Sequence, residues 1–137
     1  MSKKLILTHP LLIIYFWFTL EKNKIHKLPL KNYSKSQFNK DDLIKKINRI
    51  SDEFLKCNDL IHFEELMQEH ESIISKAISI NPIQKSTFMG YKGGKIKSLG
   101  SWGGDFILVT TKNKDLTYFK NRGLNTIFPL REIVYID

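Results

Sequence analysis

The residues from Lys97 to Phe106 have the composition of an anion-binding turn. They read Lys-Ser-Leu-Gly-Ser-Trp-Gly-Gly-Asp-Phe. Three glycines within Gly100 to Gly104 allow positive φ angles and can bring backbone N–H groups close to a ligand. Lys97 would add a point charge, whereas the carboxylate of Asp105 would repel a phosphate unless a cation lay between them. A tight turn that needs glycine only for its conformation is the alternative, and the residue pattern by itself favours it.

A predicted helix upstream of this turn carries two histidines, and His70 falls on its apolar side. An imidazole there needs a hydrogen-bond partner, and a half-buried histidine that has one is the simplest interpretation. His62 lies about 12 Å away along the helix axis, too far for both to bind one metal ion. We therefore predict no metal site. The sequence also lacks the nucleophile elbow, the phosphate loop and the dinucleotide fingerprint, so we predict no catalytic residue of its own.

The composition predicts one globular domain. The chain has 137 residues and a net charge of +8, with 42% hydrophobic and 26% charged residues. Its arginines are Arg49, Arg122 and Arg131 among 22 basic residues, and this scarcity argues against nucleic-acid recognition. The single cysteine, Cys57, excludes an intramolecular disulfide and a cysteine-based zinc site. A cytoplasmic location is the default expectation.

The N-terminal segment, residues 1–38, combines an apolar run with a lysine-rich loop. Leu11 to Leu20 is rich in aromatic and β-branched residues, which is typical of a strand buried on both faces. This run is about half the ~20 residues that a membrane-spanning helix needs, and no small-x-small cleavage site follows it. We therefore predict a central strand. A membrane anchor formed by Leu5 to Leu20 is the alternative.

Residues 39–137 form the predicted main domain. Asn39 and Asp59 are each suited to cap a helix, the first ending near Cys57 and the second at Pro82. Downstream, the apolar period changes from 3.6 to 2, which predicts strands. The shorter predicted elements are strands at 95–99, 106–111 and 126–128, and a helix at 115–122 that ends before Gly123.

The order of these elements predicts the fold. Counting the N-terminal strand, it is β, α, α, β, β, α, β. This order indicates an α+β fold in which an antiparallel, ferredoxin-like sheet has helices packed on one face.

Three segments together resemble the C-terminal domain of the GHMP small-molecule kinases. Lys97 to Phe106 resembles the family's C-terminal motif, usually Lys-x-Thr-Gly-Ala-Gly-Gly-Gly-Gly, which reads Gly-Ala-Trp-Gly-Gly-Asp in a bacterial mevalonate-kinase-like branch. Glu65 to Ile74 resembles the upstream helix, commonly Leu-Met-Asn-x-x-His-x-x-Leu, and Tyr118 to Pro129 resembles the end of that branch. The resemblance spans residues 40–137.

The resemblance implies ATP-dependent phosphorylation of a small alcohol or sugar, and the mevalonate-kinase-like branch indicates mevalonate as the substrate. It also implies a ferredoxin-like C-terminal domain that forms one wall of the substrate cleft. Trp102 and Asp105 stand where the general motif has glycine, and His70 matches the helix residue that faces the cleft. The candidate substrate- or phosphate-binding residues are Lys97, Gly100, Ser101, Trp102, Gly103, Gly104, Asp105 and His70.

The family's nucleotide loop, Pro-x-x-x-Gly-Leu-Gly-Ser-Ser, and its acid/base aspartate have no counterpart in this sequence. The chain thus resembles the back half of a kinase, as a fragment, a truncated gene product or a separated domain. ATP and Mg²⁺ are implied for the full-length kinase, and we expect neither to bind tightly to this chain alone. Self-association through the face that would meet the missing half is a further hypothesis. The alternative function is a non-enzymatic, ferredoxin-like binding module that recruits an anionic partner through its lysines.

Overall fold

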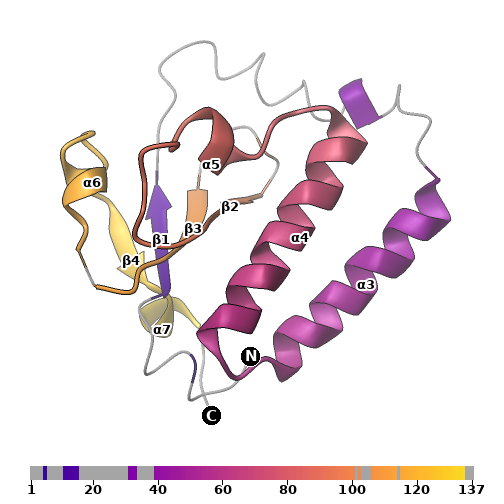
Figure 1. The fold of residues 1–137 in the computed structure, drawn as a ribbon, viewed down its shortest axis with the longest axis horizontal. Coiled ribbons are helices and arrows are strands. Elements are labelled where there is room, and N and C mark those ends of the chain that lie inside the picture. The colour runs from indigo at the N-terminus through magenta and orange to yellow at the C-terminus, as the bar shows by residue number, and fades with distance from the viewer. Residues whose placement is uncertain are drawn as a thin grey trace.

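An antiparallel sheet lies at the centre of the fold (Figure 1). A computed structural model describes residues 5, 11–15, 31–33, 39–100, 102, 106–113 and 115–134. These residues form a four-stranded sheet in the order β2-β3-β1-β4, every neighbouring pair antiparallel. The strands are β1 (Leu11–Tyr15), β2 (Ile96–Leu99), β3 (Phe106–Thr110) and β4 (Ile127–Pro129).

The N-terminal strand is central, as predicted. Leu12 pairs with Val109 of β3 on one side and with Pro129 of β4 on the other. Residues 16–20 of the predicted strand, and residues 21–30 and 34–38 of the predicted loop, lie outside the described residues; residues 31–33 are helical. No helix in the described part of the chain is long and apolar enough to cross a membrane.

Two long helices begin where the sequence predicts. In α3 (Lys40–Lys56), the Asn39 side chain accepts hydrogen bonds from the N–H groups of Asp41 and Asp42. In α4 (Leu60–Ile78), the Asp59 carboxylate accepts one from the His62 N–H at 2.8 Å. Each side chain satisfies N–H groups that the first turn of a helix leaves free.

The end of α4 differs from the prediction. The helix ends at Ile78 rather than at Pro82, because Ser79 adopts a left-handed conformation with φ 52°. The Ser75 hydroxyl donates to the Ile80 carbonyl at 2.6 Å and fixes the path of the chain as it leaves the helix. Pro82 instead precedes the short helix α5. The remaining short helices are α5 (Ile83–Ser86), α6 (Thr117–Lys120) and α7 (Leu130–Ile133).

Both faces of the sheet are covered, which corrects the prediction of helices on one face. The first face packs against α4 and α3, and its core includes Leu11, Leu108, Ile50, Phe63 and Met67. The opposite face packs against the segment from α5 to Tyr91 and against α6 (Figure 1), with a core that includes Leu12, Ile107, Phe88, Tyr91 and Phe119. The helix predicted at 115–122 is present as α6 (Thr117–Lys120), but its position on this face was not predicted. The helix α5 was not predicted, because four residues are too few to give a helical period.

Side chains occupy the outer edge of β2. The Thr110 N–H donates to the Lys95 carbonyl, so the alternate N–H groups of Ile96 and Ser98 point away from β3. They donate to Gln84 Oε1 and to Glu71 Oε1 respectively, each at 2.9 Å. The edge strand is therefore closed by an amide and a carboxylate from the neighbouring helices.

A buried polar contact joins α4 to the last residue of β3, beside the start of β2. The Thr110 hydroxyl donates to Glu64 Oε1 at 2.6 Å and accepts the Lys95 N–H at 2.8 Å, and both side chains are buried. We expect Thr110→Val to lower the free energy of unfolding by about 1–3 kcal/mol, because it leaves a buried carboxylate and an N–H without these partners. Chemical denaturation measures the loss. Thr126→Val, at an exposed loop position, is the matched control, and equal effects of the two substitutions would contradict the prediction.

Candidate functional site

The turn between β2 and β3 is described at two of its positions. Gly100 has φ +73° and Trp102 has φ +62°, so both adopt the left-handed conformation that favours glycine. Trp102 thus keeps a glycine-like backbone at a position where the kinase motif usually has glycine. The other predicted residues of the turn lie outside the described residues: Ser101, Gly103, Gly104 and Asp105.

The side chain of Trp102 ties the turn to the two long helices. It is half-buried and packs against a cluster formed by Leu43 of α3 and by Ala77 and Ile78 of α4. Gly100, by contrast, is exposed, and a Cβ atom added to it would meet nothing within 4 Å. The turn is therefore held by the indole at one position and leaves its backbone accessible at the other.

His70 lies on α4 and is half-buried. Its Nδ1 atom is buried and has no hydrogen-bond partner among the described residues. Burial, helped by the positive charge of Lys97, lowers the pKa of His70 from 6.5 to about 4. The imidazole is therefore neutral near neutral pH, with one ring nitrogen available to a partner.

Lys97 points back onto α4. Its side chain is 11% exposed, its Nζ donates to the Ser98 carbonyl at 3.0 Å, and it lies 3.8 Å from Glu71 Oε1. Burial lowers the pKa of Lys97, and the Glu71 carboxylate opposes that shift. The positive charge of Lys97, which the sequence analysis expects to attract an anion, is therefore already partly neutralised by Glu71.

Glu71 is the partner that the sequence analysis missed. Its side chain is 4% exposed, and its Oε1 accepts the Ser98 N–H while its Oε2 forms no hydrogen bond with the described residues. Burial raises the pKa of Glu71 to about 7, against the opposing effects of Lys97 and the N–H groups of Ser98 and Ile83. Glu71 and Glu64 are seven residues apart, two helical turns, so they share a face of α4 with Met67. That shared spacing is the signal that could have identified both as buried.

His70 and Glu71 of α4 and Lys97 of β2 therefore form a largely buried polar group where α4 meets β2, and Lys97 lies three residues before Gly100. A neutral imidazole, a carboxylate whose pKa lies near 7 and an ammonium group can together orient a polar ligand or hold a proton. We refer to these three residues as the α4–β2 polar group.

An apolar hollow also borders Gly100. It has a volume of about 470 Å³ and its lining is almost entirely apolar. Gly100 contributes to this lining, so the turn borders both the hollow and the strand that carries Lys97. The remaining lining residues are Ile13, Leu99, Phe106, Phe128 and Ile133.

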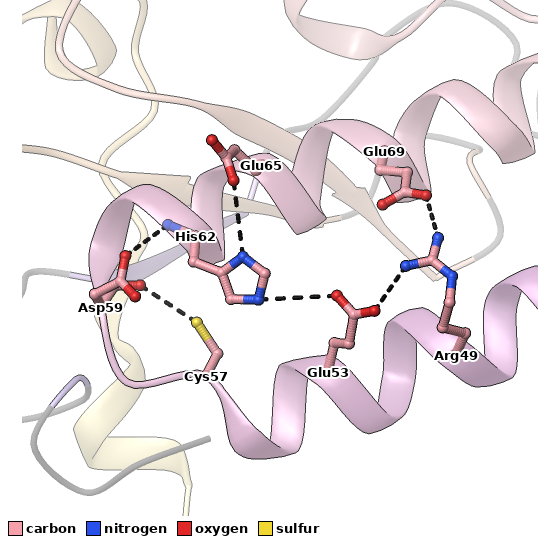
Figure 2. Close-up of polar contacts among 7 residues, drawn as sticks. All are labelled: Arg49, Glu53, Cys57, Asp59, His62, Glu65 and Glu69. Carbon is pink, nitrogen blue, oxygen red and sulfur yellow. Dashed lines mark hydrogen bonds and ion pairs between the residues drawn. The ribbon is translucent and has the colours of Figure 1, made fainter.

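A separate polar network joins α3 to α4 (Figure 2). Arg49 pairs with Glu53 of its own helix and with Glu69 of α4. His62 lies between Glu53 and Glu65, 3.8 Å and 3.7 Å from their carboxylate oxygens. Across the described part of the chain, no group of three His, Cys, Asp or Glu residues could hold a metal ion. The network holds two helices together at an exposed surface.

Comparison with known proteins identified no relative of this chain. No family model matches the chain, and no curated protein and no solved structure matches it.

Proposed function

We propose that this chain forms one wall of the substrate cleft of a GHMP-type kinase, which would phosphorylate a small alcohol such as mevalonate with ATP. The carrying observation is the contact between the two segments on which the resemblance depends. Glu71, from the helix segment, accepts the Ser98 N–H at 2.9 Å and lies 3.8 Å from Lys97 Nζ, and both partners belong to the glycine-rich segment. In this proposal the turn and the α4–β2 polar group face the substrate.

The apolar hollow and the α4–β2 polar group suit the two ends of such a substrate. The apolar hollow of about 470 Å³ is large enough for a short carbon skeleton. The Nδ1 of His70 is buried and unpartnered among the described residues, so it would pair with a substrate hydroxyl or carboxylate after the half-buried ring turns toward the cleft. Catalysis of phosphoryl transfer consists mainly of positioning and charge stabilisation, and a wall of this kind contributes positioning.

The described residues do not fit a complete site for Mg·ATP. Mg²⁺ is usually held by carboxylates, and across residues 39–100 and the other described ranges no metal-capable cluster exists. Lys97, in the strand that precedes the turn, is paired with Glu71. The nucleotide would therefore be held by another polypeptide segment, and this chain alone is expected to give no ATP-dependent turnover of mevalonate.

A titration of the ¹⁵N-labelled chain tests the proposal. Mevalonate, added after Mg·ATP, is expected to shift amide signals around Gly100 and His70 and to leave the α3–α4 network unchanged. We expect His70→Gln to weaken mevalonate binding about fivefold, the effect of losing one hydrogen bond. His62→Gln, the same substitution eight residues earlier on the exposed side of α4, is the control.

Saturable shifts that His70→Gln weakens and His62→Gln leaves unchanged would support the proposal. Shifts elsewhere, or none in a well-dispersed spectrum, would overturn it. Phosphorylation of mevalonate by the pure chain would contradict the expectation that a second polypeptide segment holds the nucleotide.

A further inference from the structure

A second, polar hollow lies between α4 and α5, along the closed edge of β2. Its volume is about 750 Å³, and its lining is a mixture of cationic, anionic and hydroxyl- or amide-bearing side chains. Its size falls within the range of small-molecule sites. The lining residues used below are Glu71, Ser72, Lys76, Asn81, Lys85 and Lys95.

The lysines of this hollow have uncompensated charges. Among the described residues, no ion pair involves Lys76, Lys85 or Lys95. The two carboxylates of the lining are already paired, Glu69 with Arg49 and Glu71 with Lys97. Three ammonium groups around one concavity therefore attract an anion with several acceptor oxygens.

The hollow also offers partners for hydroxyl groups. Glu71 belongs to the lining, and its buried Oε2 forms no hydrogen bond of normal geometry with the described residues, although the Ile83 N–H acts on the carboxylate. The side chains of Ser72 and Asn81 form no hydrogen bond within the described part of the chain. A bare phosphate would use the lysines and leave these groups unpaired, whereas a ligand with hydroxyls would satisfy both sets.

We propose that this hollow binds a small phosphorylated polyol, with the phosphoryl group at the lysines and the hydroxyls at Glu71, Ser72 and Asn81. The hollow does not include the Gly100 turn, although it shares Glu71 with the α4–β2 polar group, and its proposed ligand goes beyond the proposed kinase function. An adjoining hollow of about 370 Å³ shares Gln84, Lys85 and Lys95 with it and adds Lys92, which leaves room at the phosphoryl end.

The test is an amide titration with D-glucose 6-phosphate as the probe, at about 0.15 M salt to screen non-specific attraction. Saturable shifts are expected at Ser72, Lys76, Lys85 and Lys95. Lys85→Gln is expected to weaken binding about fivefold, since it removes one charge-assisted hydrogen bond. Lys45→Gln, at an exposed position on α3, is the charge-matched control and should leave the affinity unchanged.

Two further arms separate the parts of the ligand. Inorganic phosphate and D-glucose should each bind more weakly than D-glucose 6-phosphate. Inorganic phosphate that binds as tightly as the sugar phosphate would reduce the hollow to a simple anion site and overturn the proposal. The proposal also fails if Lys45→Gln weakens binding as much as Lys85→Gln, or if no saturable shift occurs. Shifts at Lys76, Lys85 and Lys95 distinguish this ligand from mevalonate, whose shifts are expected at Gly100 and His70.

Discussion

Replacing Gly94 with alanine is expected to destabilise the fold by about 3 kcal/mol or more, at the upper end of the cost of overpacking a core. A Cβ atom on Gly94 would lie 2.2 Å from the Thr110 carbonyl oxygen and 2.7 Å from its carbonyl carbon. Those atoms are backbone of the adjoining strand and cannot rotate away. The Thr110 carbonyl also accepts the Tyr91 hydroxyl at 2.7 Å, so any movement there disturbs a buried contact.

Gly100→Ala is the control for this substitution. Gly100 has φ +73° and open space around it, so alanine there meets only the backbone cost of a left-handed conformation, about 1–2 kcal/mol. Urea denaturation of both variants measures the difference. A Gly94→Ala protein that does not fold, with a collapsed amide spectrum, agrees with the prediction. One as stable as Gly100→Ala contradicts it.

Glu71 and His70 are expected to give the free energy of unfolding opposite dependences on pH. The pKa of Glu71 rises from 4.5 to about 7 on folding, so between these values the folded chain holds more protons than the unfolded chain. The contribution of Glu71 to the free energy of unfolding therefore falls as the pH rises from 4.5 to about 7. The pKa of His70 drops from 6.5 to about 4, so its contribution increases with pH over most of the same window. In the wild-type chain the two slopes largely cancel.

Substitutions should reveal each slope. In His70→Gln the Glu71 slope stands alone, and stability should decrease by roughly 3 kcal/mol between pH 4.5 and pH 7, the free-energy equivalent of the Glu71 shift. In Glu71→Gln the His70 slope stands alone, and stability should increase from pH 4 to pH 6.5. Denaturation at several pH values measures both. Slopes of the same sign in the two variants would show that the two residues are not buried as described.

Local signals in the sequence were enough to predict the frame of the fold. Asn39 and Asp59 were identified as caps because a short polar side chain before an apolar helical period satisfies the first free N–H groups. The run that begins at Leu11 was predicted to be a central strand because it is rich in aromatic and β-branched residues, as expected of a strand buried on both faces, and β1 does pair with a strand on each side.

The closest contacts could not be predicted, because they depend on which strand meets which helix. The sequence does not indicate that Thr110 would donate to Glu64 or that Ser98 would donate to Glu71. His70 and Lys97 were predicted as candidate site residues on separate grounds, and only the packing of α4 on β2 brings the charge of Lys97 close enough to affect His70. The constraint on Gly94 could not be predicted either, because the backbone that excludes a side chain there belongs to β3, which is adjacent in space but distant in sequence.

The closed edge of β2 also bears on how copies of this chain behave at high concentration. An exposed strand edge is a template on which another chain can add a strand, and repeated addition leads to fibrils. At β2 the outward N–H groups of Ile96 and Ser98 are already taken by Gln84 and Glu71, and Lys97 takes the Ser98 carbonyl. An incoming strand would have to displace all three side chains and leave a carboxylate and an ammonium group buried without partners. The residues that shape the candidate site therefore also keep the sheet from growing at this edge.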